Sequence, residues 1–290
     1  MNDINGSLGG VSAPEDKTGR AAALIPEQRR EMIVRHLRKH QMLGVHQLTE
    51  LLGCSHMTVR RDVAALEESG RVFAIPGGVR IASHLVIEPS HQTKFTTDQP
   101  LKRGIAAHVA RLLKPGMTIY LDAGTTTACL VPHIVGLPDM TVITNDLHIA
   151  LTLADSPQVA VVHTGGTLDH SNGSTIGPLA AATLRQLVVD IAFLSASSWD
   201  LERGVTTPSL AKVEVKLAAI GIASQRVLLA TSAKYGTYGT YRVAGLDEFD
   251  LIATDDSMSE ASIQRLRETG LDLAIASALP DAFDAPALVA

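Results

Sequence analysis

The residues best suited to binding chemistry in this 290-residue chain directly follow short apolar runs. One such stretch is DAGTTT, residues 122–127, which offers a carboxylate, a glycine for a tight turn and three hydroxyls. Amide groups at the start of a helix, together with threonine hydroxyls, can surround an anion such as phosphate. The stretch is not a P-loop, because the GxxxxGK(S/T) motif is absent from the chain.

Similar motifs close the apolar runs that follow. Each motif on its own is more often a turn or a cap than a ligand contact, but their recurrence after successive runs indicates one shared site. Small residues, hydroxyls and a lysine suit a polyhydroxylated, phosphorylated ligand. The motifs are TND at 144–146, HTGG at 163–166, SASSWD at 195–200, and Lys234 in TSAKYG.

Strands that alternate with helices must position these motifs. Continuous apolar strands alternating with helical patterns predict a parallel sheet covered on both faces, whose ligands bind at the carboxyl ends of the strands. The predicted strands lie within 117–124, 140–145, 159–166, 190–197, 226–234, 250–256 and 271–276, and helices are predicted at 146–154, 178–187, 209–224 and 259–269.

A second group of chemistry-bearing residues lies near the N-terminus. Ser55 suits the N-cap of a helix that buries Val59 and Val63, which leaves Arg60 and Arg61 on other faces near the helix start. Two helices precede this one, and a tight turn joins the second and third, as in a helix-turn-helix. Arginine there can bridge O6 and N7 of guanine or neutralise a phosphate.

A hairpin with Pro76, Gly77 and Gly78 at its turn follows the third helix, so the sequence predicts a winged helix-turn-helix. The alternative is a protein-docking module, because two arginines on a helix are usually a solvated face. Asp62 would orient one of the arginines or favour the helix N-terminus.

Charge and composition narrow the classes further. Residues 26–82 carry a net charge of +3 in a chain of net charge −5, so a basic module precedes an acidic body. Two cysteines without a CxxC pair and eleven scattered histidines predict no disulfide, metal site or cofactor. Without a signal peptide or an apolar run of about 20 residues, we expect a cytoplasmic protein that does not enter a membrane.

The N-terminal residues resemble the DNA-binding domain of the DeoR family of bacterial transcription regulators. Ser55, Thr58 and the Arg60-Arg61-Asp62 run match the family pattern in register, and Gly70, Gly77 and Gly78 match it downstream. Ala74 and Pro76 stand where the family commonly has arginine and histidine, so the wing here lacks those two side chains for contacts to phosphate. By resemblance, the DNA-binding residues are Ser55, His56, Met57, Thr58, Arg60, Arg61, Gly77 and Gly78.

The body resembles the DeoR-type sensor domain, which is related to ribose-5-phosphate isomerase. The matching positions include Asp-x-Gly-Thr-Thr at 122–126, Thr-Asn at 144–145, Glu-x-Lys at 214–216 and Lys234. Lys102 matches a family lysine of open role, while Thr231 and the SASSWD stretch depart from the pattern. By resemblance, the effector-binding residues are Asp122, Gly124, Thr125, Thr126, Thr127, Asn145, Gly165, Gly166, Ser195, Glu214 and Lys234.

The alternative is a sugar-phosphate isomerase with an accessory DNA-binding domain. Proton abstraction beside a carbonyl needs a poised base, commonly a carboxylate. Isomerases of this fold carry an acid-rich loop after the central strand, and the corresponding stretch here keeps Asp200 alone. We therefore expect no catalytic residues and no enzyme activity.

The sequence thus predicts a transcriptional repressor of a carbohydrate operon. It would bind double-stranded operator DNA and leave it when a phosphorylated sugar or sugar acid binds the body. A homo-oligomer, dimer or tetramer, is expected because paired half-sites multiply affinity. The helix of residues 102–113 and apolar faces on the body could form the contact between copies. The expected organisation is a disordered tail at 1–24, a winged helix-turn-helix at 25–82, a linker at 83–101, a Rossmann-like, sugar-phosphate-isomerase-type α/β sensor domain at 102–278, and a tail at 279–290.

Overall fold

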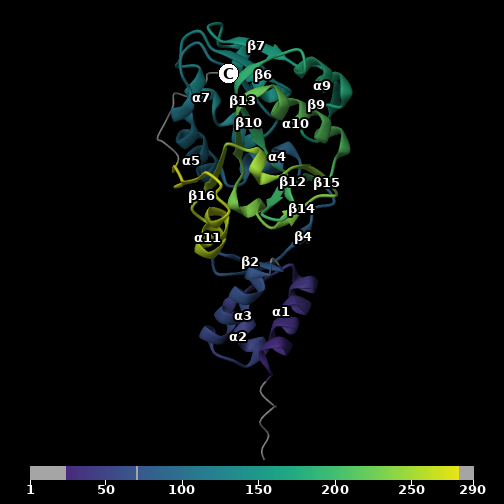
Figure 1. Ribbon diagram of the computed structural model, residues 1–290, viewed down its shortest axis with the longest axis vertical. Coiled ribbons are helices and arrows are strands. Elements are labelled where there is room, and N and C mark those ends of the chain that lie inside the picture. The colour runs from purple at the N-terminus through teal and green to yellow at the C-terminus, as the bar shows by residue number, and fades with distance from the viewer. Residues whose placement is uncertain (1–23, 70, 281–290) are drawn as a thin grey trace, which may run out of the picture.

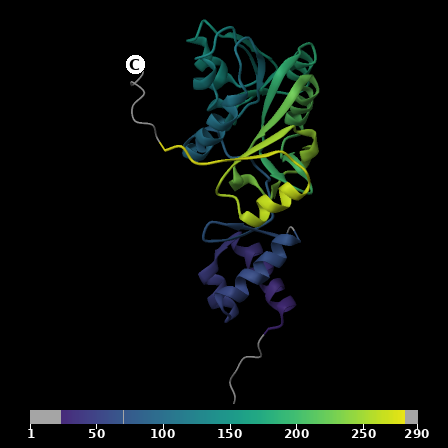
Figure 2. The same cartoon turned by 60° about the vertical axis from the view of Figure 1, so that its left-hand side comes forward.

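The protein has two folded parts that lie end to end, a small helical module and a larger α/β body (Figures 1 and 2). This computed structural model describes residues 24–69 and 71–280. The predicted tails fall almost entirely outside these residues. Within the described residues, no helix is both long and apolar enough to cross a membrane.

The small module contains the three predicted helices and the predicted hairpin. Its helices pack around a shared apolar core that includes Ile33, Leu48 and Val63. An additional short strand pairs with the hairpin, because α1 ends at His40 and Gln41 adopts a φ of 64° that turns the chain. The elements are α1 (Pro26–His40), β1 (Met42–Gly44), α2 (Val45–Leu52), α3 (His56–Glu68), β2 (Val72–Ile75) and β3 (Gly78–Ile81), with the antiparallel strand order β1-β3-β2.

Local signals explain the ends of these elements. Gly53 ends α2 in the left-handed conformation, and the Ser55 hydroxyl accepts a hydrogen bond of 3.2 Å from the Thr58 amide at the start of α3. Gly77 has a φ of 75° at the hairpin turn, a value that favours glycine. A Cβ on Gly78 would lie 2.6 Å from the Leu43 carbonyl oxygen, so β3 can approach β1 this closely only with glycine there.

The body is built on one parallel seven-stranded sheet, and all seven predicted strands are in it. The strand order is β17-β16-β13-β10-β5-β6-β7, which places the first and fourth predicted strands side by side. The strands are β5 (Thr118–Leu121), β6 (Thr141–Thr144), β7 (Ala160–His163), β10 (Val189–Ser195), β13 (Ala223–Leu229), β16 (Leu251–Asp255) and β17 (Leu273–Ala276).

Helices cover both faces of this sheet. Along β5, Ile119 and Leu121 pack into one core and Tyr120 into the other, as the two-residue period of a strand requires. The first face is covered by α5 (Gln99–Val109), α6 (Thr125–Ala128), α7 (Val131–Ile134) and α8 (Leu147–Ala154), and the second by α9 (Pro178–Leu184), α10 (Leu210–Ile222) and α11 (Glu260–Glu268).

Helix α5 overlaps residues 102–113, where the sequence predicts a contact between copies. Ile105, Ala106 and Val109 of α5 are fully buried in the core of the body. The apolar face of residues 102–113 is therefore packed inside the chain, and only the other faces of this helix are left for the expected contact with a second copy, which stays a prediction.

Smaller elements lie at the edges and were not predicted. Residues 83–101, expected to be a linker, contain β4, α4 and the start of α5. The remaining elements are β4 (Ser83–His84), α4 (His91–Thr96), η1 (Ala110–Leu112), β8 (Thr167–Asp169), β9 (Ser174–Ile176), β11 (Ser198–Asp200), β12 (Gly204–Thr207), η2 (Ser232–Lys234), β14 (Thr237–Tyr238), β15 (Tyr241–Ala244) and η3 (Leu246–Glu248).

The module is docked on the body through its hairpin and the end of α3. Phe73 of β2 meets Tyr235 edge to face, with ring centroids 5.3 Å apart. The Arg80 guanidinium donates to the backbone carbonyls of Ala233 and Tyr235. Figure 1 shows β2 at the junction, facing the end of the body that carries α11.

Candidate functional site

The candidate ligand site lies where β5 and β10 run side by side. The chain leaves β5 for helices on one face and leaves β10 for α10 on the other face. Such a point, where the connections diverge, opens a crevice at the carboxyl ends of the strands. Asp122 directly follows β5, and Ser195 is the last residue of β10, so the two predicted residues meet there.

Asp122 is the buried centre of a polar network. Its Oδ2 accepts hydrogen bonds from the Ser195 amide at 2.9 Å and the Ser195 hydroxyl at 2.8 Å, and it also receives the Lys216 ammonium. Lys216 Nζ donates a further 2.6 Å bond to the Ser195 carbonyl. The carboxylate is thereby paired and hydrogen-bonded, as a buried charge must be.

Asn145 joins the same network from the end of β6. Its Oδ1 accepts from the Ala123 amide and the Tyr120 hydroxyl, each at 2.9 Å, while its Nδ2 donates to the Thr175 carbonyl at 2.9 Å. Burial and the nearby Asp122 charge raise the pKa of Tyr120 well above its usual value, so this phenol stays a neutral donor. Asn145 thus connects the turn after β5 to the segment around Thr175.

Two further lysines share a carboxylate on the other side of the cavity. Glu88 places one oxygen 2.7 Å from Lys94 Nζ and the other 2.7 Å from Lys212 Nζ. Lys212 also lies 3.2 Å from Asp169, and Lys94 donates to the Asn172 side chain. Burial alone would raise the pKa of Glu88, but the Lys212 and Lys94 charges outweigh burial and lower it far below its usual range.

Lys234 and Lys102 have different surroundings. Lys234 Nζ donates to the Ala196 carbonyl at 2.7 Å, and burial lowers its pKa to about 8. Lys102 is buried and donates to the carbonyls of Lys94 and Thr97, the latter at 2.6 Å. Lys102 therefore stabilises the C-terminal end of α4.

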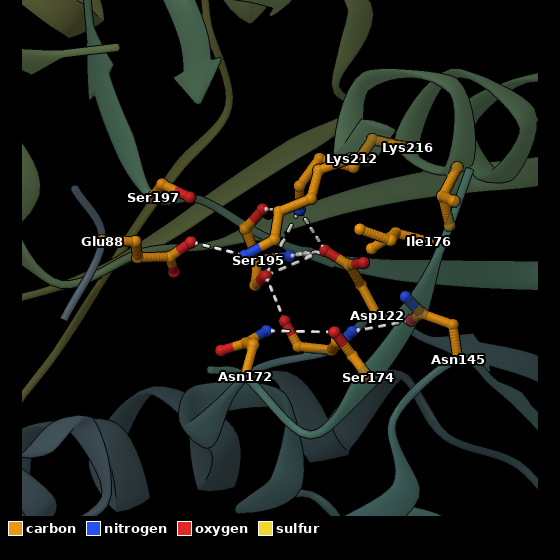
Figure 3. A pocket seen from close by; sticks show the side chains of 12 residues that line it. Glu88, Asp122, Asn145, Asn172, Ser174, Ile176, Ser195, Ser197, Lys212 and Lys216 are labelled. Atoms are coloured by element: carbon orange, nitrogen blue, oxygen red, sulfur yellow. Dashed lines mark hydrogen bonds and ion pairs between the residues drawn. The ribbon is translucent and has the colours of Figure 1, made fainter. Parts of the chain in front are cut away.

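The networks around Asp122 and Glu88 line a cavity of about 20 Å³, which is room for about one water molecule. Figure 3 shows Glu88 entering the cavity from the side opposite Asp122 and Asn145. The polar residues around it include Glu88, Asp122, Asn145, Asn172, Ser174, Ser195, Lys212 and Lys216.

A larger groove of about 690 Å³ lies beside α6, but its lining is mainly apolar. It includes Phe95, Val131 and Pro132, along with Thr125 of the predicted phosphate loop. The smaller cavity is the better candidate for an anionic sugar, because its charged and hydroxyl groups converge there.

The structure brings some of the predicted effector residues together and leaves others apart. Asp122, Asn145 and Ser195 line the cavity, and a Cβ on Gly124 would lie 2.9 Å from the Ser195 Cβ. The Thr127 hydroxyl donates to the carbonyls of Asp122 and Gly124 at 2.6 and 2.7 Å, which shapes the turn. The predicted residues outside the lining of the cavity are Gly124, Thr125, Thr126, Thr127, Gly165, Gly166, Glu214 and Lys234.

Glu214 is exposed on α10, whereas Lys212 and Lys216 of the same helix are buried and reach the cavity. Lys212 and Lys216 are four residues apart in a helix whose only other charged residue is Glu214, so they share one face, which was the available sequence signal. Sequence reasoning missed Glu88, Lys94, Asn172, Ser174, Ser197 and Lys212 as residues of this site and left Lys216 without a role.

The candidate DNA interface lies at the start of α3. Ser55, His56, Met57, Arg60 and Arg61 are exposed there, and Thr58 is half-buried. In the hairpin, Gly77 is exposed at the turn whereas Gly78 is buried against β1.

Asp62 orients neither Arg60 nor Arg61. Its carboxylate is buried and accepts from Arg29 of α1, with Nε at 2.6 Å and a second guanidinium nitrogen at 3.3 Å. This bidentate pair ties α1 to α3 and leaves the two exposed arginines available to an external partner.

One cation of the basic module, in the hairpin, contacts the body. Arg80, a cation of the basic module, points to the body rather than to solvent. Phe73 and Arg80 thus connect the hairpin to the residues on either side of Lys234.

Comparisons with known proteins agree with this arrangement. Residues 29–84 match the DeoR-like helix-turn-helix domain, and residues 97–256 match the DeoR C terminal sensor domain. The HTH-type transcriptional regulator YgbI of Escherichia coli (strain K12) is 40% identical over 253 residues, covering 87% of this chain and 99% of that protein. The transcriptional repressor AccR of Agrobacterium fabrum is 30% identical over 230 residues, covering 79% and 89%.

Solved structures are more distant. Ribose 5-phosphate isomerase A from Methanocaldococcus jannaschii matches with a TM-score of 0.36 and 18% identity, over 48% of this chain and 55% of that one. A translation initiation factor eIF-2B of Pyrococcus horikoshii OT3 matches with a TM-score of 0.38 and 13% identity, over 82% and 90%. Neither likeness bears on function. From the two domain matches and the closely related regulators, the chain belongs to the DeoR family of transcriptional regulators.

Proposed function

We propose that this regulator is a repressor that a phosphorylated sugar or sugar acid releases from its operator. The observation that carries the proposal is the cluster of buried lysines at the switch point of the sheet, in a chain whose other end exposes Arg60 and Arg61. A polyanion fits the exposed arginines, and a small anion fits the buried lysines.

The charges of the cavity favour an anionic ligand with hydroxyls. The cavity lining carries two ammonium groups and two carboxylates. With the charged groups directly beside the cavity included, four ammonium groups stand against three carboxylates, which is an excess of one positive charge. Hydroxyls of Ser174, Ser195 and Ser197 surround these charges and can bind sugar oxygens. The ammonium groups belong to Lys94, Lys212, Lys216 and Lys234, and the carboxylates to Glu88, Asp122 and Asp169.

We assign to this site Asp122, Asn145 and Ser195 as direct contacts, and Gly124 to Thr127 as the turn that supports them. Lys234 lies next to the cavity and belongs to the same site in our proposal. The division into a DNA-binding domain at 25–82 and a sensor domain at 102–278 fits both halves of this function.

The pocket suits a sensor better than an isomerase. Asp122 is occupied by Lys216 and Ser195, so it is not poised as a free base. Asp200 accepts from the Arg203 guanidinium at 2.8 Å and from the Glu202 amide at 2.9 Å, which holds it in a turn. We therefore propose a regulator without catalytic activity, acting as a homo-oligomer on paired half-sites.

Binding of DNA fragments selected from the source genome tests the DNA half of the proposal. Arg60→Ala and Arg61→Ala should each weaken binding. A lost base contact costs about 1–3 kcal/mol, and a lost phosphate contact lowers by about 1 the slope of the logarithm of the binding constant against the logarithm of the salt concentration. Arg185→Ala, which removes an exposed charge from the body, should bind as wild type does. Wild-type affinity in both α3 variants would show that this helix does not bind DNA.

Thermal melting against phosphorylated sugars, sugar acids and their unphosphorylated forms tests the sensor half. A specific ligand stabilises the folded protein by about 2.7 kcal/mol at a hundredfold excess over Kd. The same compound should release DNA without being consumed. Turnover of the compound would favour the isomerase, and no response to any compound would remove the sensor assignment.

A further inference from the structure

We propose that Glu88 is a built-in anion of the ligand pocket, which the phosphate or carboxylate of an effector must displace. Its displacement would free the segment that joins the two domains. This inference rests on the proposed function, because it concerns the same pocket, and it assigns a regulatory residue to it.

The position of Glu88 in the chain singles out its side chain. Val86 and Ile87, directly before it, are exposed by 68% and 82%, whereas the Glu88 side chain is exposed by 14%. The segment therefore runs over the surface and sends one carboxylate inward. A buried charge is kept only where it is paired, so the two lysines are what holds this side chain in the pocket.

The geometry of the pair is that of a bound anion. Each oxygen of Glu88 lies 2.7 Å from a different ammonium group, Lys94 from α4 and Lys212 from α10. Two oxygens of a phosphate or of a sugar acid would make the same two charge-assisted contacts. With Glu88 in place, the cavity of about 20 Å³ does not admit a sugar phosphate.

The same segment leads directly to the DNA-binding module. Ile81 ends the wing strand β3, and Ser83–His84 form β4, which pairs with β14 at Thr237–Tyr238. The Leu85 amide extends this pairing with a 2.7 Å bond to the Tyr238 carbonyl. The ion pairs of Glu88 are the next contacts along the segment. Without them, β4 and the wing would be attached to the body by fewer contacts.

Glu88→Gln tests the inference, because glutamine keeps the shape and removes the charge. The probe is inorganic phosphate, titrated against thermal melting. We expect the variant to bind phosphate at least tenfold more tightly than wild type, since no internal carboxylate competes for Lys94 and Lys212. Glu268→Gln removes the same charge from an exposed position on α11, outside the pocket, and should match wild type.

Hydrogen exchange of residues 83–90 is the second measurement. In wild type, phosphate should speed exchange of these amides, and in Glu88→Gln they should exchange fast without phosphate. If Glu88→Gln does not fold, Glu88→Asp serves instead. It keeps the charge but is one methylene too short to reach both lysines, and should bind phosphate more tightly than wild type.

The outcomes separate this inference from the proposed function. Equal phosphate affinity in wild type and the Glu88 variants, with unchanged exchange, would refute displacement while leaving the sensor intact. No binding of phosphate to wild type or variants would overturn displacement, and sugar phosphates that also fail to bind would overturn the sensor. If the Glu88 variants bind phosphate more tightly than wild type and the control variant does not, the result supports displacement.

Discussion

Among single residues, Lys234 is the one whose charge is most sensitive to its surroundings. Burial is the largest effect and lowers its pKa to about 8 from the usual 10.5. Glu88 opposes this shift, while Lys94, Lys102 and Lys216 add to it. An anion in the pocket would favour the charged form, so binding and protonation of Lys234 should be linked.

We predict that phosphate affinity falls as pH rises through about 8, because Lys234 attracts the anion in its ammonium form and not in its neutral form. Titrations between pH 7 and 9.5 would measure this slope. Lys234→Met should flatten the profile while leaving DNA binding in place. A slope that survives the substitution would assign the proton to another group.

Through Lys234, the free energy of unfolding depends on pH in the opposite direction to the phosphate affinity. Between pH 8 and 10.5 the unfolded chain still holds the proton that folded Lys234 has lost. The contribution of Lys234 to the free energy of unfolding therefore rises with pH across this window. Urea unfolding of wild type and Lys234→Met without phosphate would isolate this contribution.

At the scale of elements, the loop from η2 to β14 connects the ligand pocket to the wing. It carries Lys234 on the pocket side, and its Tyr235 and Gly236 contact the hairpin of the small module. Gly236 has a φ of 78°, and a Cβ there would overlap the Phe73 ring. This glycine permits both the turn and the close approach of β2.

Gly236→Ala should lower the free energy of unfolding by about 2–4 kcal/mol, since a positive φ costs about 1–3 kcal/mol and the Phe73 ring must also move. Combining it with Phe73→Ala should cost less than the sum of the two single changes, because the overlap is removed. Gly221→Ala, in open space on α10, is the control and should not destabilise. Additive costs in the double variant would contradict the overlap.

At the scale of the whole molecule, α3 runs from the exposed end of the small module to the sensor domain. Arg60 and Arg61 are exposed at its start, and Glu67 is buried at its end against the body. Glu67 Oε1 accepts from the hydroxyls of Ser259 and Ser262 at 2.8 and 3.0 Å, and from the Ala74 amide at 3.1 Å. Glu67 thus ties the end of α3 directly to the start of α11.

Glu67→Ala should uncouple the two domains, because it leaves buried donors unsatisfied at about 1–3 kcal/mol each. Calorimetry should then show the small module melting separately and before the body. Glu68→Ala, at the exposed neighbouring position, should melt as wild type does. One unchanged transition in Glu67→Ala would show that the junction does not depend on this carboxylate.

The sequence alone determined the main elements of both domains, which are the three helices and the hairpin of the module and the seven sheet strands of the body. Helical spacing of Val59 and Val63 behind an N-cap predicts α3, and apolar runs that alternate with helical patterns predict the seven sheet strands. Both signals are local, since they depend on neighbours within one element. They also predicted that Asp122, Asn145 and Ser195 would meet, because carboxyl ends of parallel strands share one edge.

Only the tertiary structure decided which charges pair. Glu88 reaches Lys212 across 124 positions of the chain, and Arg80 reaches the carbonyl of Ala233 across 153. Glu214 and Lys216 belong to one motif, yet the rotation of α10 exposes the first and buries the second. Such partners follow from packing between distant elements, and no periodicity within an element encodes them.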